Sequence, residues 1–208
     1  VNVSSLKQAY RKALKKYRLA VGSTLLIPGP KMIFQGDEKG EMTYFKFFRE
    51  LSCGYEKCLE SKGYKPGLEA FKDSKLGSIK YSKKYNIDLN NTSKFVKTLN
   101  KINFQNKALQ TGTVENTIPH PVSWVHASYC IKDDNKIFAI KNFSDVSYYS
   151  NYLITFPKGK WTEIINSDSS QFGGDDNFLN NKEIISDGEN PTKISLPDWG
   201  IAAFRNME

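Results

Sequence analysis

Apolar residues recur at intervals of three and four along the first 22 residues, which predicts an amphipathic helix. They are Leu6, Ala9, Tyr10, Ala13, Leu14, Tyr17, Ala20 and Val21, and basic side chains fill the opposite side. Ser4 or Ser5 can cap the start of this helix, and Gly22 stands near its end. Because the apolar face has to be covered, we expect the helix to lie on another element, most simply a sheet.

A short apolar run of Met32, Ile33 and Phe34 predicts a buried strand at residues 31–34. It follows the turn sequence "PGP" at residues 28–30, and it stops before Gly36. Two acidic side chains that can do chemistry, Asp37 and Glu38, come next. A helix followed by a strand is the order of an α/β unit, and one such unit cannot form a domain alone.

Residues 39–90 have weak periodicity and are rich in Gly, Lys and aromatic side chains. Apart from a short helical pattern at 44–51, we expect a functional loop that lies over a surface or cleft. A second amphipathic helix is predicted at residues 93–103, where the apolar side is formed by Phe95, Val96, Leu99 and Ile102.

From Val122 onward the pattern changes to short β-rich runs separated by turn residues. The runs are "VSWVHASYCI", "KIFAIKNF", "NYLITF", "WTEII", "TKISL" and "IAAF". Turn signals every eight to twelve residues indicate a small antiparallel sandwich. The polar, Gly-rich stretch "NSDSSQFGGDDNFLNN" between two of the runs is predicted to be a loop.

Composition allows a folded, soluble protein, because 39% of the 208 residues are hydrophobic and 13% are aromatic. The net charge of +8 is unevenly distributed. Residues 1–112 contain 22 Lys and Arg against 9 Asp and Glu, a net +13, whereas residues 113–208 contain 8 against 13, a net −5. A basic half is compatible with nucleic acid or another polyanion. The lysines form no compact run and no recognition motif, so a solvated lysine-rich surface is favoured and no nucleic-acid partner is expected.

Neither a membrane span nor an export signal is visible in the sequence, so no membrane partner is expected. The helical pattern already runs near Val1, which suggests that the sequence begins partway through a longer protein. Cys53, Cys58 and Cys130 form no zinc-type pattern and cannot all pair with one another. These cysteines favour a reduced, cytoplasmic setting.

The order of features resembles the C-terminal end of an α-amylase superfamily enzyme, glycoside hydrolase family 13. The resemblance rests on "LIPGPKMIFQGDE", a helix running into "NKALQTG", and then "FAIKNFS", "WTEIINSDSSQFGG" and "LPDWGIAAF". Within it, "INSDSSQFGG" is most similar to the C-terminal domain of the glycogen branching enzyme type. The resemblance covers nearly the whole chain in order, except for residues 50–90.

The resemblance implies an α+β fold class: a helix, the eighth strand and a helix that close a (β/α)8 barrel, followed by an all-β antiparallel sandwich. Residues 4–22 would be the seventh helix, 31–34 the eighth strand and 92–104 the eighth helix. This divides the chain into a barrel remainder at 1–112 and a C-terminal β-sandwich domain at 113–208. A whole barrel needs about 250 residues, more than the chain has.

By the same resemblance, Gln35, Asp37 and Glu38 lie on the catalytic face of the barrel, at the edge of the sugar-binding cleft. They are candidate substrate-binding residues, although acids after a strand more often cap a helix or hold a loop. Retaining hydrolysis or transfer needs two carboxyl groups about 5–5.5 Å apart on opposite sides of the scissile bond. Adjacent residues such as Asp37 and Glu38 cannot flank one sugar in that way.

In the family the nucleophile, the acid/base and the stabilising aspartate come from strands four, five and seven, upstream of Val1. We therefore assign no catalytic residue and no cofactor to this chain, and expect it to be inactive alone. The full-length protein is expected to cleave or transfer α-1,4 glucosidic linkages, with α-glucan and the rest of its own barrel as partners. The loop favours a branching-enzyme type, and hydrolysis remains open. The alternative is a stand-alone, non-catalytic carbohydrate-binding β-sandwich module.

Three tryptophans and two histidines are candidates for further roles. Trp124 and Trp161 alternate like strand residues, so we expect them in the core or at a domain interface. Trp199 lies in a turn and is the best candidate for exposure and for stacking on glucose. His120 and His126 have no cysteine or serine partner at motif spacing, which favours surface or packing roles over catalysis.

Oxygen-bearing side chains of the polar loop could supply ligands to calcium. They are Asn166, Asp168, Asp175, Asp176 and Asn177. Their spacing is not that of an EF-hand loop, so a solvated loop is favoured and no metal site is predicted.

Overall fold

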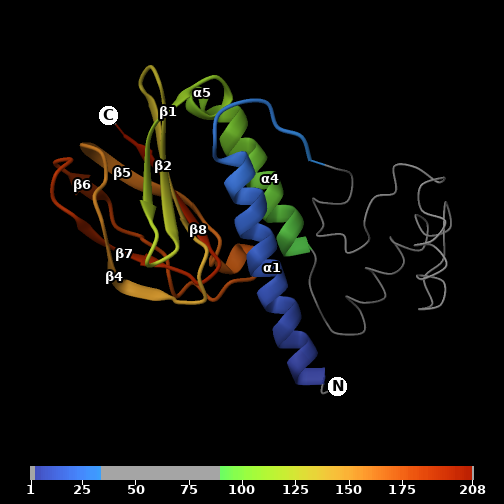
Figure 1. Cartoon of the computed structure of the whole chain (residues 1–208). Helices are drawn as coiled ribbons and strands as arrows, with labels where there is room; N and C mark the ends of the chain where they lie inside the picture. The colour runs from blue at the N-terminus through green and yellow to red at the C-terminus, as the bar shows by residue number, and fades with distance from the viewer. Residues whose placement is uncertain (1–2, 34–89, 208) are drawn as a thin grey trace.

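The structure, a computed structural model, describes residues 3–33 and 90–207. The elements in chain order are α1 (Val3–Leu25), α4 (Asn90–Gln105), α5 (Lys107–Gln110), β1 (Thr113–His120), β2 (Val125–Lys132), β3 (Asn135–Asn142), β4 (Tyr148–Ile154), β5 (Gly159–Asn166), the 3-10 helix η2 (Ser170–Phe172), β6 (Ile184–Ser186), β7 (Thr192–Leu196) and β8 (Ile201–Asn206). Figure 1 shows α1 and α4 side by side, on one side of the strands. The predicted order of helices followed by an antiparallel β domain is confirmed.

Two antiparallel sheets form the β domain. The larger sheet has six strands in the order β1-β2-β3-β8-β5-β6, and the smaller one pairs β4 with β7. Turns at the predicted Asp and Gly positions join β2 to β3 and β4 to β5. Because successive side chains of a strand point to opposite faces, the central strands of the larger sheet bury both faces.

The hydrophobic core is divided by the larger sheet into two clusters. One cluster lies between this sheet and the helices, and includes Leu19, Phe95, Leu99, Ile137 and Ile201. The other lies between the two sheets, and includes Phe138, Phe156, Trp161, Leu196 and Phe204. The helices and the sandwich therefore share buried contacts in three layers: helices, large sheet and small sheet.

The helix α4 buries the side that its sequence pattern predicts, with Phe95, Val96, Leu99 and Ile102 in the core. The helix α1 does not follow the prediction as closely. It packs on the sandwich through Arg18, Leu19 and the residues around Gly22 and Leu25, whereas Ala9, Ala13 and Ala20 are exposed. The covered face of α1 is thus on the other side from its alanines.

The observed strands differ from the sequence prediction in three places. The prediction missed β1, which contains a proline and several polar residues, and β6, which has 3 residues. The strand expected at 31–34 lies partly outside the described residues, and its described part, residues 31–33, has no regular structure. A parallel barrel strand depends on neighbouring strands for its hydrogen bonds. In the described parts of the chain, no helix is both long and apolar enough to cross a membrane.

Candidate functional site

Three of the four predicted substrate-binding residues, Gln35, Asp37 and Glu38, lie outside the described residues, as do Cys53 and Cys58. Their proposed contact with sugar stays a prediction.

Just before the three predicted site residues, Lys31 is tied to the end of α1 and to α5. Its ammonium group donates to the Ile27 carbonyl, to the Gly29 carbonyl at 2.6 Å and to the Leu109 carbonyl at 3.4 Å. The main-chain N–H of Gly29 also donates to the Gln110 carbonyl at 3.3 Å. These contacts fix the place from which the chain leaves the helices.

Trp199, the fourth predicted site residue, is half-buried against α1. Its ring lies 4.1 Å from the Lys16 ammonium and 6.0 Å from that of Lys12, in cation–π geometry. Its neighbour Asp198 accepts a hydrogen bond from Lys15 at 2.6 Å. Lysine side chains of α1 thus cover Trp199, so the expectation that it is the most exposed tryptophan is wrong. Its contact with sugar stays a prediction.

The other two tryptophans have opposite environments. Trp161 is fully buried, as predicted, and its indole N–H donates to the Pro157 carbonyl at 2.7 Å. Trp124 was expected in the core or at a domain interface, and it is not in the core, since it is 68% exposed. The reason is that β2 begins at Val125, so Trp124 belongs to the preceding turn and has a left-handed φ of 53°.

The polar loop after β5 is organised around the buried carboxylate of Asp168. This carboxylate accepts backbone N–H groups of Asn177 at 2.9 Å and Phe178 at 3.2 Å, and more weakly that of Asp175 at 3.5 Å. Burial raises the pKa of Asp168, and these backbone hydrogen bonds partly offset the rise. The loop is therefore held by its own backbone, and is not merely solvated as the sequence suggested.

The backbone geometry of this loop explains why glycines occupy positions 173 and 174. A Cβ atom at Gly174 would lie 1.9 Å from the Asp168 carbonyl oxygen, so no side chain fits there. Gly173 adopts a φ of 82°, which glycine accommodates at little cost. Gly174 is thus required by the close approach of the chain to Asp168, and Gly173 is favoured by its left-handed backbone conformation.

The acidic side chains of the loop do not form a metal site in the part of the chain that the structure describes. The Asp168 oxygens face backbone donors, and the Asp176 carboxylate accepts the Ser170 N–H at 2.6 Å. No cluster of three or more His, Cys, Asp or Glu among the described residues is arranged to hold a metal ion. The calcium alternative therefore gains no support from the geometry.

Arg18 joins α1 to this loop, and sequence reasoning did not single it out. Its side chain is buried and donates to the Phe172 carbonyl at 3.1 Å. Burial lowers its pKa, and the negative charge of Asp168 opposes this effect. One feature of the sequence could have indicated the burial of Arg18. It lies four residues before Gly22, and this spacing places both residues on the face of α1 that packs on the sandwich.

A second buried cation, Lys141, lies on the helix-facing side of β3. Its ammonium donates to the Ser128 hydroxyl at 3.1 Å, and burial lowers its pKa. On the same side of the sheet lie Cys130, whose pKa burial raises, and His126, whose pKa is lowered by burial and by Lys141. His126 is partly buried, and its surface or packing role stays a prediction. No local pattern in the sequence indicates a buried lysine in this strand.

Replacement of Lys141 by methionine is expected to raise the free energy of unfolding by about 1–2 kcal/mol near neutral pH, because a buried charge is removed. The lowered pKa means that the native state binds fewer protons than the unfolded chain between the folded pKa and the usual value of 10.5. The wild type therefore gains stability relative to the variant as the pH rises through this window.

Thermal unfolding of the wild type and of Lys141→Met at about pH 7 and about pH 10 measures this effect. The Tm of the variant should exceed that of the wild type at the lower pH, and the difference should be smaller at the higher pH. Lys132→Met, an exposed lysine on β2, is the matched control and should give a difference that does not change with pH. A Tm lower in Lys141→Met than in the wild type at neutral pH would contradict the prediction.

Comparison with known proteins identifies the β domain. Residues 119–206 match the family described as "Alpha amylase, C-terminal all-beta domain". No curated protein matches the chain. The chain is similar in structure to the trehalulose synthase MutB from Pseudomonas mesoacidophila MX-45, with a TM-score of 0.56 and 18% identity over 92% of this chain and 38% of that chain.

Two further solved structures have similar scores. The isomaltulose synthase SmuA from Protaminobacter rubrum has a TM-score of 0.53 and 14% identity over 93% of this chain and 38% of that one. The α-amylase from H. orenii has a TM-score of 0.55 and 17% identity over 92% of this chain and 35% of that one. At these identities the likeness shows the fold, and the chain spans little more than a third of each of these proteins.

Proposed function

We propose that the chain is the C-terminal part of an α-glucan-active enzyme of the α-amylase superfamily, glycoside hydrolase family 13. The observation that carries this proposal is the match of residues 119–206 to the C-terminal all-β domain of α-amylases. The likeness to solved structures supports it, because it extends over 92% of the chain and so includes the helices as well as the sandwich.

The uncovered face of α1 supports the same interpretation. Ala9, Ala13 and Ala20 are exposed on the side of α1 away from the sandwich. Small side chains allow a helix to approach another element closely, and an outer helix of a (β/α)8 barrel needs such a face against its strands. In this proposal the alanine face contacts the rest of the catalytic barrel, and the opposite face holds the sandwich.

For the reaction we propose a retaining mechanism at α-1,4 glucosidic linkages, with catalytic carboxylates supplied by barrel strands outside these 208 residues. A branching-enzyme type is favoured by the "INSDSSQFGG" resemblance. The neighbours named above are a trehalulose synthase, an isomaltulose synthase and an α-amylase, so one fold serves different reactions and does not choose between transfer and hydrolysis.

An assay of the full-length gene product on amylose tests this proposal. We expect the iodine colour of amylose to fall with time, because chains are shortened or branched. A simultaneous rise in reducing ends indicates hydrolysis, whereas α-1,6 signals without that rise indicate branching. The 208-residue chain serves as the control and is expected to show no turnover. A full-length product with no action on amylose would contradict the proposed substrate class.

The alternative function, a stand-alone carbohydrate-binding module, is favoured by one observation: Trp124 is exposed on the sandwich. The intact mass of the natural protein distinguishes the two. A mass far above 23.7 kDa supports the enzyme, and a mass near 23.7 kDa supports the module. A cytoplasmic location remains a prediction in either case.

A further inference from the structure

Trp124 occupies a position that folding alone does not favour. It is 68% exposed, so it contributes little to the core, and its φ of 53° is a conformation that bulky residues rarely adopt. A glycine or asparagine would fit this turn with less strain. An exposed, strained tryptophan is therefore an observation that points to a role outside folding.

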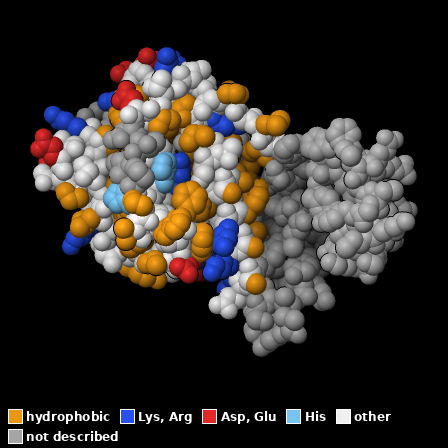
Figure 2. Space-filling model, viewed as in Figure 1, with side chains coloured by type: hydrophobic (Ala, Val, Ile, Leu, Met, Phe, Trp, Pro, Cys, Tyr) orange, Lys and Arg blue, Asp and Glu red, His pale blue; other side chains and the backbone are white. Residues whose placement is uncertain are grey.

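Next to Trp124 in sequence, the turn between β1 and β2 forms one wall of an open hollow of about 430 Å³. The hollow is lined by His120, Pro121, Val122, Ser123 and Tyr148. Val122 is 96% exposed at its edge. Figure 2 shows hydrophobic side chains gathered on this face of the molecule, near the two histidines.

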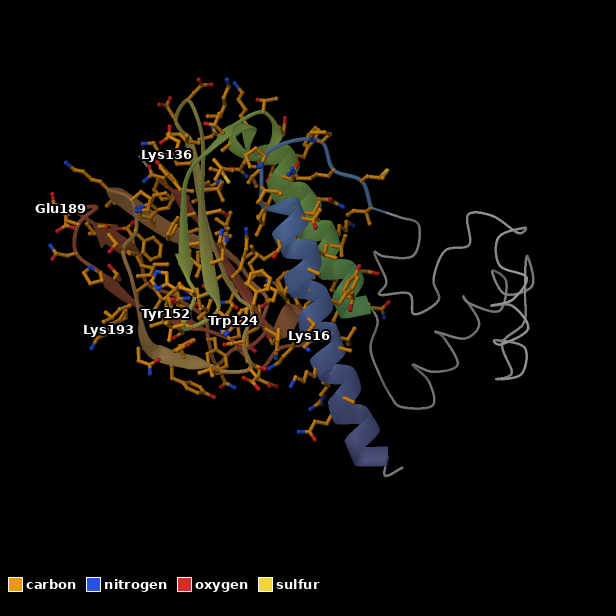
Figure 3. All side chains as sticks on the ribbon, in the orientation of Figure 1. Lys16, Trp124, Lys136, Tyr152, Glu189 and Lys193 are labelled. Atoms are coloured by element: carbon orange, nitrogen blue, oxygen red, sulfur yellow. The ribbon has the colours of Figure 1, made fainter. Side chains whose placement is uncertain are left out.

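Contacts with the buried Tyr152 hold three of the lining residues of the hollow in place. The Tyr152 hydroxyl lies 3.1 Å from the Ser123 hydroxyl, and its ring packs against His120 at 5.7 Å and Tyr148 at 4.7 Å. Figure 3 shows that Trp124, from the turn before β2, and Tyr152, from β4, lie at the same end of the sandwich. Aromatic rings and hydroxyl groups thus meet here from the end of β1, from the turn that follows it and from β4.

This combination fits a neutral sugar better than an ion. Pyranose rings present an apolar C–H face that packs on aromatic rings, and hydroxyl groups that bond to Ser, Tyr and His. None of the lining residues is an acid, a lysine or an arginine. A phosphate-bearing ligand needs cationic partners, so the lining disfavours it.

We propose that this hollow and the exposed Trp124, which directly follows the lining residue Ser123, bind a linear α-glucan chain, so that the β domain holds substrate at a site of its own. The choice of α-glucan among neutral sugars rests on the proposed function. The site differs from the predicted one at Trp199, whose ring is covered by Lys16.

Calorimetric titration of the 208-residue chain with maltoheptaose, an α-1,4-linked oligosaccharide, tests the site. Trp124→Ala is expected to weaken binding by about tenfold, the loss of one aromatic contact. Ile185→Ala removes a side chain that is 73% exposed on β6, far from the hollow in sequence and strand order, and should leave binding unchanged.

Trp124→Gly is the second variant, and it separates binding from folding. It should weaken binding as Trp124→Ala does, yet raise Tm by about 2–4 °C, because the left-handed strain is relieved. Loss of binding together with higher stability is a result that a purely structural role of Trp124 would not produce.

Each outcome of the titration has a defined meaning. Unchanged maltoheptaose affinity in both Trp124 variants, or no binding by the wild type, overturns the site even if the full-length enzyme acts on amylose. Trp124-dependent binding of cellohexaose, a β-1,4-linked probe, in place of maltoheptaose overturns the α-glucan assignment and counts against the proposed function. Trp124-dependent binding of maltoheptaose alone supports both.

Discussion

Replacement of Asp168 by alanine is expected to lower the free energy of unfolding by about 3–5 kcal/mol, because buried backbone donors lose their acceptor and the buried Arg18 loses a nearby opposite charge. The Asp168 carboxylate is buried and holds the backbone N–H groups of Asn177 and Phe178 at 2.9 and 3.2 Å. Its removal leaves these donors unsatisfied. It also removes the negative charge that offsets the burial of Arg18.

Urea or thermal unfolding of the Asp168→Ala chain measures this loss, which corresponds to a Tm lower by roughly 10 °C. Asp168→Asn keeps the shape and one acceptor oxygen, so its loss should be smaller. Asp176→Ala is the control from the same loop, because Asp176 is exposed and its hydrogen bonds are with the neighbouring Ser169 and Ser170. Equal stability of Asp168→Ala and Asp176→Ala would show that Asp168 does not organise the loop.

The sequence predicted the strands that carry strong alternation and clear turn signals. The hairpin of β2 and β3, the strands β5, β7 and β8, and the buried side of α4 all follow local patterns. The strand β1 was missed because "TVENTIPH" has neither alternation nor enough apolar residues. Its pairing with β2 is a tertiary effect, since a neighbouring strand supplies the hydrogen bonds.

The environments of the tryptophans could not be read from local pattern. The prediction for Trp124 depended on where β2 begins, and a difference of three residues, Val125 instead of Val122, moved the side chain from strand to turn. The prediction that Trp199 is exposed was wrong because Lys16, more than 180 residues earlier in the chain, lies over its ring. A turn sequence indicates exposure only if no distant element covers it.

Buried charges are the other feature that the sequence did not show. Arg18 lies in a helix that carries five other basic residues in its predicted polar face, and nothing local separates it from them. Its burial follows from the position of the Asp168 loop, which contacts α1 on the helix side of the large sheet. The same holds for Lys141, whose partner Ser128 comes from the neighbouring strand.

Phe172→Ala is expected to lower the free energy of unfolding by about 3–5 kcal/mol, the loss that is typical when a buried phenylalanine is replaced by alanine. Phe172 is 1% exposed, and its ring packs edge-on against Phe95 of α4 at 5.1 Å. Its carbonyl also accepts the hydrogen bond from Arg18 of α1. One loop residue thus contacts both helices, and its loss should weaken the attachment of the helices to the sandwich.

Denaturant unfolding followed by two probes tests whether the predicted domains at 1–112 and 113–208 unfold separately. Far-UV circular dichroism reports mainly the helices, and fluorescence reports the three tryptophans, all of which lie after residue 113. Because the helices share one core cluster with the large sheet, we expect both midpoints to fall together in Phe172→Ala. Phe104→Ala, which removes an aromatic ring that is 82% exposed on α4, should move neither probe appreciably. A shift of the helical signal alone would mean that the boundary near residue 112 divides two independently folding units, and that the sandwich does not need the helices for its stability.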